Sequence, residues 1–394
     1  MESARPDEAV GTIERALNEG QDPAGLLTLL EHVEHHAPAA LPRGPGGSLS
    51  VHGLRLKIRL TGNARTPADV VTLINEAQAA GHRDGFLFAH LAWALTQQED
   101  FPGALQAAET ALRDREHLTT RELGLALRIK GFAQNRLDPG SDWEGTFREA
   151  LDASEGGWTR GLILLDLGGL RSRAGNEPGA MLAYTDALKL VISTTHRAML
   201  LNNMGVVCLR LGRFAEAEAY FMQVAALKST YRSRALSGQA AARRALGEWA
   251  RAESLYRQAA SASRDEDDLR QALRGLGYTQ RLAGRHMQAL ETLRGAATTT
   301  RSDREAGQSW VNVDVAATLA SLDVPDVRAA EAHLARSGPL DTEDAQRAVI
   351  VRAELARRTG KRDQAATLLG TVSPGALWTR EEAHAFESLF TLLP

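Results

Sequence analysis

The sequence is poor in the residues that mark several common classes of protein. Its 394 residues include a single cysteine, Cys208, which excludes an internal disulfide framework. Aromatic residues make up only 5% of the chain, and the apolar residues are mostly alanine and leucine, which is typical of closely packed helices. Because Cys208 lies on an apolar helical stripe, we expect it to be a small buried side chain and not a reactive thiol.

Long apolar runs and a strong net charge are also missing. No run approaches the roughly 18 apolar residues that a membrane-spanning helix needs, and the N-terminus has no signal-peptide pattern. The formal net charge is −3, which gives no global reason to expect nucleic-acid binding. We therefore expect a cytoplasmic protein that contacts neither membrane nor nucleic acid.

Signatures of catalysis are absent as well. The chain has no G-x-x-x-x-G-K phosphate-binding loop and no G-x-S-x-G nucleophile elbow. The most metal-like segment is "EHVEHH", where His32, His35 and His36 share one helix face and could hold a transition metal. It completes no known metal signature, and an exposed polar helix face is the alternative. We expect no cofactor, no metal and no enzymatic activity.

What the chain does contain is an internal repeat. The stretch "LLNNMGVVCLRLGRFAEAEAYFMQVAAL", residues 200–227, has three related copies, and the turn glycines of these four segments are Gly175, Gly212, Gly247 and Gly284. Subtraction gives spacings of 37, 35 and 37 residues. Gly360 follows 76 residues later, which is two periods of 38, so one unit without the glycine lies between. Glycine suits a helix C-terminus because it takes a positive φ without steric cost.

Each unit reads as a helical hairpin. Apolar residues recur at i, i+3, i+4 and i+7 on both sides of the turn at Gly212, which predicts two amphipathic helices. The first stripe consists of Leu201, Met204, Gly205 and Cys208, and the second of Phe214, Ala217, Phe221 and Val224. The small residues Gly205 and Ala217 allow the two backbones to approach closely.

This pattern resembles the tetratricopeptide repeat, a family with a period of about 34 residues. The family's small first-helix position is matched by Gly168, Gly205, Ala240 and Gly277, its second-helix alanine by Ala180, Ala217, Ala252 and Ala289, and its aromatic position by Tyr184, Phe221, Tyr256 and Leu293. The match is best over 161–298 and weaker over 86–151 and 306–370. The period is slightly long, and the proline that often closes the family's unit is missing. The resemblance implies an all-α solenoid, a right-handed superhelix of about ten hairpins.

The repeats predict three regions along the chain. Residues 86–377 form the repeat array, and residues 1–85 form divergent helical repeats with a loop rich in proline and glycine at 37–50, which is either a hinge or a plain long connection. Residues 378–394 are expected to form a terminal capping helix, because Thr379 and Glu382 have the spacing of a capping box.

Two adjacent asparagines in the first helix of the 200–227 unit suggest a binding surface. Asn202 and Asn203 lie one residue round from the apolar stripe, outside the hairpin core. The resemblance implies that first helices line the concave surface, which holds extended peptides in this family. An amide side chain offers a donor and an acceptor, so it can bind a peptide backbone of any sequence. The alternative is that these amides satisfy a backbone group internally.

The same stripe can be followed through the other repeats. It yields the candidate groove residues Arg128, Phe132, Asn135, Asp166, Arg234, Arg244, Arg274, Tyr278 and Arg281. This inferred groove is basic, and arginine makes forked contacts with carboxylates, so an acidic or carboxylate-terminated peptide is the expected ligand. Alternatively, the arginines pair with acidic neighbours across the repeats.

The sequence therefore favours a non-enzymatic protein–protein interaction scaffold that binds a peptide in its concave groove. A second hypothesis is a regulatory protein that senses a ligand or peptide, similar to the helical-repeat arm of bacterial transcription regulators but without a DNA-binding module of its own. Self-association into a homo-oligomer is compatible with both hypotheses, although no specific interface is evident in the sequence.

Overall fold

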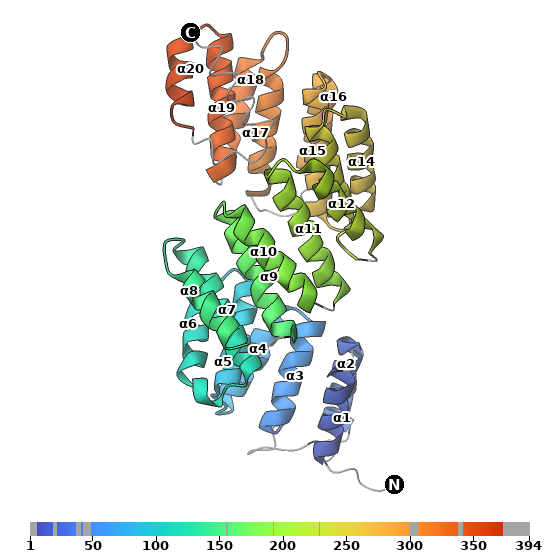
Figure 1. The fold of residues 1–394 in the computed structure, drawn as a ribbon, viewed down its shortest axis with the longest axis vertical. Helices are drawn as coiled ribbons and strands as arrows, with labels where there is room; N and C mark the ends of the chain where they lie inside the picture. Colours follow the sequence, from blue (N-terminus) through green and yellow to red (C-terminus); the bar gives the residue numbers. More distant parts are fainter. Residues whose placement is uncertain are drawn as a thin grey trace. The chain divides into compact units, whose positions relative to one another are not determined.

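The chain folds into a series of α-helices (Figure 1). The computed structural model describes residues 6–18, 22–36, 41, 49–154, 157–191, 193–227, 229–298, 306–337 and 342–372. The first ten helices are α1 (Pro6–Asn18), α2 (Pro23–His36), α3 (Val51–Ala64), α4 (Pro67–Ala79), α5 (Gly85–Gln97), α6 (Phe101–Arg113), α7 (Thr120–Leu137), α8 (Trp143–Asp152), α9 (Gly157–Arg173) and α10 (Glu177–Leu190). They are followed by α11 (Thr194–Arg210), α12 (Phe214–Ala226), α13 (Arg232–Ala245), α14 (Trp249–Ala262), α15 (Glu266–Leu282), α16 (His286–Thr298), α17 (Ala306–Ala320), α18 (Val327–Arg336), α19 (Thr342–Arg358) and α20 (Arg362–Leu369). The described residues contain no β-strand, which confirms the all-α prediction.

The helices follow one another as hairpins, in agreement with the repeat period. The N-terminal region, where the sequence signature is weak, also forms two successive helix pairs, α1–α2 and α3–α4. The helix pair α17–α18 is the predicted unit without a turn glycine. The capping helix expected at 378–394 lies outside the described residues, as does most of the loop expected at 37–50.

The chain divides into two compact units. Unit 1 comprises residues 1–174 and 185–191, and unit 2 comprises residues 175–184 and 192–394. Within the described residues, no helix is both long and apolar enough to cross a membrane. Cys208 is fully buried in unit 2, as its place on an apolar stripe predicts, and burial raises the pKa of its thiol.

The turn glycines have the left-handed conformation that their spacing predicts. Gly212 ends α11 with φ 71°, its N–H donates to the Leu209 carbonyl at 3.0 Å, and the Arg213 N–H donates to the Cys208 carbonyl at 2.8 Å. These two bonds form a Schellman motif, which satisfies carbonyls at the helix end. Positive φ angles of 76–78° also occur at Gly175, Gly247, Gly284 and Gly360.

One turn adopts the same geometry without glycine. Glu99, between α5 and α6, has φ 63°, and its N–H donates to the Thr96 carbonyl at 3.1 Å. The next N–H, of Asp100, donates to the Leu95 carbonyl at 3.0 Å, so the bonding pattern is that of the glycine turns. A left-handed residue with a Cβ carries a steric cost. The repeat geometry is therefore imposed on this turn against the local preference of its residue.

In several repeats, buried rings of the second helices pack against glycines of the first helices. The buried ring of Phe221 on α12 lies against Gly205 of its own hairpin and Gly238 of the next. A Cβ at Gly205 would lie 2.7 Å from this ring, and one at Gly238 would lie 2.5 Å from it. Tyr256 on α14 meets Gly275 on α15 still more closely. No larger residue fits at these glycines unless the ring moves.

We predict that Glu99→Gly stabilises the protein by about 1 kcal/mol, because it removes the cost of a left-handed non-glycine residue. The measurement is chemical denaturation followed by circular dichroism. The matched control is Gln98→Gly at the neighbouring exposed residue, whose φ is −92°. It should lower stability by about 0.5 kcal/mol, because there glycine only adds freedom to the unfolded chain. Equal effects of the two substitutions would contradict this account.

Candidate functional site

The odd-numbered helices form an inner row in each unit. In unit 1 consecutive odd-numbered helices from α1 to α9 are in direct contact, and in unit 2 the same holds from α11 to α19. No two successive even-numbered helices make a comparable contact in the described residues. Because the odd-numbered helices lie closer together, each row curves toward them. We call their solvent-facing side the inner face of each unit.

The two asparagines lie on the inner face of unit 2. Their neighbours Leu201 and Met204 are buried against the rest of the unit, whereas Asn202 and Asn203 are only half-buried. Neither amide makes a hydrogen bond to any residue that the structure describes. Each amide therefore retains a donor and an acceptor for a ligand.

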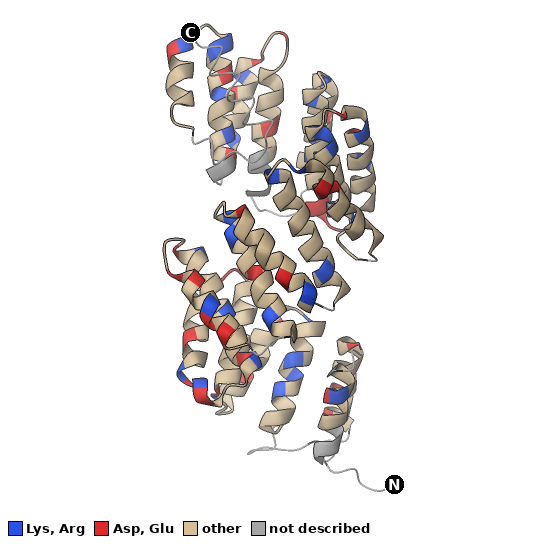
Figure 2. Ribbon diagram, in the orientation of Figure 1, with Lys and Arg blue, Asp and Glu red and all other residues tan. Residues whose placement is uncertain are grey.

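Three of the candidate arginines pair with carboxylates on the neighbouring odd-numbered helix. Arg128 Nε donates to Asp166 Oδ2 at 2.6 Å, and Arg234 Nε donates to Asp268 Oδ1 at 2.7 Å. Basic and acidic residues are accordingly interleaved along the helices of both units (Figure 2). The internal pairing considered from the sequence is therefore present, and it compensates the charge of these arginines.

Arg274 belongs to a larger ion network between α15, α17 and α19. Its Nε donates to Asp314 Oδ2 at 2.5 Å and its Nη2 to Asp344 Oδ1 at 2.9 Å. Arg347 completes the network with bonds to the same two carboxylates at 2.8 and 2.9 Å. Asp314 is only 2% exposed, so its charge depends on these two partners. The Arg274 side chain thus holds the inner row together.

Tyr278 is enclosed by two candidate arginines. The guanidinium carbons of Arg244 and Arg281 each lie 4.7 Å from the centre of its ring, at a distance typical of cation–π contacts. Arg244 is itself buried and donates to the Tyr256 hydroxyl at 3.0 Å. Tyr278 is only 7% exposed, so little of its ring is available to a ligand. Arg281 has no carboxylate partner among the described residues.

The remaining candidates lie on α7, in unit 1. Phe132 is half-buried, with its ring centre 6.2 Å from that of Phe101 and the Arg173 guanidinium 5.7 Å from its ring. Asn135 is half-buried and makes no hydrogen bond to a described residue. The candidates thus fall on two inner faces, with Arg128, Phe132, Asn135 and Asp166 in unit 1 and the others in unit 2.

A row of basic side chains on α3 in unit 1, which pair with Glu14 and Asp84, was missed by the sequence analysis. His52, Arg55 and Arg59 follow the i, i+3, i+7 spacing on α3, and this pattern in "VHGLRLKIRL" is the signal that could have revealed it. Glu14 accepts from Arg59 at 2.6 Å.

On α5, the pKa of His90 is lowered to about 3 because the ring is desolvated and because the charges of Arg121 and Arg59 oppose its protonation.

The histidines of α2 contact one another. The ring of His36 lies 4.4 Å from that of His32 and 4.6 Å from that of His35, measured between centres. No group of three or more histidine, cysteine, aspartate or glutamate side chains suited to a metal ion occurs in the described residues.

The lowered pKa of His90 predicts a pH dependence of stability. The unfolded chain takes up a proton near pH 6.5 and the folded chain only near pH 3, so stability falls as the pH drops below 6.5. One titrating group can change the free energy of unfolding by at most about 1.4 kcal/mol per pH unit. The ring of His90 is only half-buried, so we expect a smaller change. We expect the free energy of unfolding to fall between pH 7 and 5 by about 1 kcal/mol more in the wild type than in His90→Gln. If the free energies of unfolding of the wild type and of His90→Gln changed with pH in parallel, His90 would not cause this pH dependence.

Comparison with known proteins supports the repeat assignment. Family models described as tetratricopeptide repeat match residues 235–270 and 197–229. These ranges cover most of α13–α14 and α11–α12, two of the hairpins on which the resemblance was based. No curated protein sequence matches the chain.

Several solved structures are similar to this chain at low sequence identity, and two of them share its fold with a TM-score of 0.50 or more. The apo form of the quorum sensor NprR from B. thuringiensis is 14% identical, with a TM-score of 0.57 over 74% of this chain and 86% of that chain. A Rap protein complexed with competence and sporulation factor is 13% identical, with a TM-score of 0.50 over 78% of this chain and 96% of that chain. A tetratricopeptide repeat protein from Parabacteroides merdae is 14% identical, with a TM-score of 0.47 and coverage of 77% and 97%. The helix pairing identifies a helical-hairpin solenoid, and the matched segments identify tetratricopeptide repeats at residues 197–229 and 235–270.

Proposed function

We propose that the chain is a non-enzymatic protein–protein interaction scaffold that binds an extended peptide on the inner face of unit 2. The observation that carries this proposal is the pair Asn202 and Asn203, whose amides face solvent on the inner row without a hydrogen-bond partner among the described residues. Such amides can bond to the backbone of an extended segment while tolerating many side chains. Contacts of this kind suit a scaffold, since they set the path of the bound peptide more than its sequence.

The ligand's charge preference follows from which arginines remain uncompensated. Arg234 and Arg274 already bond to buried carboxylates, so an acidic peptide gains little from them. Arg281 stacks on Tyr278 and has no carboxylate partner among the described residues. We therefore propose backbone recognition by the asparagines and a single carboxylate, from a side chain or the C-terminus, at Arg281.

We predict that Asn202→Ala combined with Asn203→Ala weakens peptide binding at least about tenfold, because roughly 1 kcal/mol is lost for each missing hydrogen bond. The ligands are peptides selected from a random 12-residue phage library on the wild-type protein, and affinity is measured by fluorescence anisotropy. The matched control is Gln223→Ala, an exposed amide on the even-numbered helix α12.

The control should bind as the wild type does. Equal binding by the asparagine double variant would remove the proposed site. Arg281→Gln then tests the charge preference. It should weaken the binding of peptides that carry a free carboxylate and leave the affinity of their amidated forms unchanged.

A peptide-sensing regulatory protein is the second candidate. It is favoured by the likeness to NprR, a quorum sensor, and to a Rap protein in complex with competence and sporulation factor, because both likenesses extend over most of each chain. At 13–14% identity, this likeness concerns the fold.

A sensor must change state when its ligand binds. We predict that a selected peptide, added at saturation, shifts the association state in light scattering if the chain is a sensor. A rise in melting temperature at unchanged molar mass is the result expected of a plain scaffold.

A further inference from the structure

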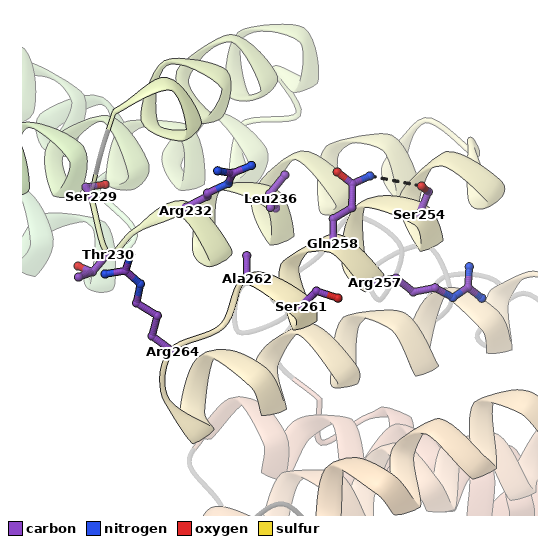
Figure 3. A pocket seen from close by; sticks show the side chains of 10 residues that line it. All are labelled: Ser229, Thr230, Arg232, Leu236, Ser254, Arg257, Gln258, Ser261, Ala262 and Arg264. Atoms are coloured by element: carbon purple, nitrogen blue, oxygen red, sulfur yellow. Dashed lines mark hydrogen bonds between the residues drawn. The ribbon is translucent and has the colours of Figure 1, made fainter.

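A pocket away from the asparagines lies beside α13 and α14 in unit 2 (Figure 3). Its volume is about 670 Å³, and it is lined by Ser229, Thr230, Arg232, Leu236, Ser254, Arg257, Gln258, Ser261, Ala262 and Arg264. These residues come from the connection before α13, the beginning of α13, the C-terminal part of α14 and the connection after it. Most of the lining belongs to the even-numbered helix and the connections, so the pocket is distinct from the proposed peptide surface.

The charge of this pocket is positive and partly uncompensated. Three arginines and no carboxylate line it. Arg257 bonds to Glu253 at 3.0 Å, and its side chain points away from Thr230 and Arg264 (Figure 3). Arg232 and Arg264 have no acidic partner among the described residues. Both guanidinium groups therefore keep an uncompensated charge, and Figure 3 shows Arg264 extending toward Thr230 whereas Arg232 points away from it.

Neutral donors add to these two charges. The Ser229 hydroxyl oxygen is buried, yet it has no hydrogen-bond partner among the described residues. Thr230 carries a second hydroxyl, and the Arg264 side chain extends toward it (Figure 3). The first turn of α13 follows directly, and its N-cap residue Tyr231 provides no side-chain bond, so backbone N–H groups and the positive helix end remain available.

We propose that this pocket binds the phosphate group of a phosphate monoester. A monoester dianion matches the positive charge of the pocket, and its oxygens can accept from Arg264, from the Thr230 hydroxyl and from backbone donors. The volume exceeds that of a phosphate alone, and Leu236 and Ala262 provide apolar surface for the organic part of the ligand. A phosphorylated side chain of a partner protein and a small organic phosphate share this chemistry.

The test measures binding to the full chain by calorimetry and by thermal shift, at constant ionic strength in chloride buffer. The probes are inorganic phosphate, adenosine monophosphate and a phosphoserine peptide, with the unphosphorylated peptide as reference. The test variant combines Arg232→Gln with Arg264→Gln, both at exposed positions. The matched control is Arg251→Gln on α14, which removes an exposed arginine that does not line the pocket.

We expect at least one phosphorylated probe to raise the melting temperature of the wild type and of Arg251→Gln, and the double variant to bind it about tenfold more weakly or worse. A response to the phosphopeptide identifies a protein source, and a response to the nucleotide identifies a small-molecule source. The proposal is overturned if no phosphorylated probe binds, or if the double variant binds as tightly as the control. Both outcomes are independent of the asparagine variants.

Discussion

The fold depends on rings that pack where a helix has no side chain. Phe221 lies between Gly205 of its own hairpin and Gly238 of the next, so one side chain fixes the packing within a repeat and between repeats. A solenoid has no central core, and each hairpin can bury its apolar stripe only against its neighbours. The glycines let one ring lie against two odd-numbered helices, and the row of these helices forms the inner face on which Asn202 and Asn203 lie.

The inner face is held together by ion pairs between neighbouring odd-numbered helices. Arg128, Arg234 and Arg274 each bond to a carboxylate on the next odd-numbered helix. A buried carboxylate such as Asp314 needs these partners, because an uncompensated charge there would be costly. The face is therefore less basic than its arginines suggest. The half-buried amides and Arg281 are then its most available polar groups, and for this reason we propose recognition of a peptide backbone over recognition of acidic composition.

The sequence predicted the parts of this structure that depend on local signals. Helix stripes and the turn at Gly212 are encoded within a few residues, and all of them are present in the structure. The turn at Glu99 shows the limit, since its geometry comes from the repeat and not from its residue. The bonds of Arg274 to carboxylates 40 and 70 residues away depend on the register between repeats, which periodicity alone does not determine. The pocket near α13 was not predicted for a related reason, because it combines two connections with one face of a helix.

The most direct test of this account is a double-mutant cycle between Phe221→Leu and Gly238→Ala, with stability measured by chemical denaturation. Helix propensity alone would make Gly238→Ala stabilising by up to about 1 kcal/mol. The packing against the ring predicts instead that it destabilises the wild type, and that this cost falls by about 1 kcal/mol or more when leucine replaces Phe221. Additive effects, or a stabilising Gly238→Ala in the wild type, would contradict the claim that the ring and the glycine set the spacing of the repeats.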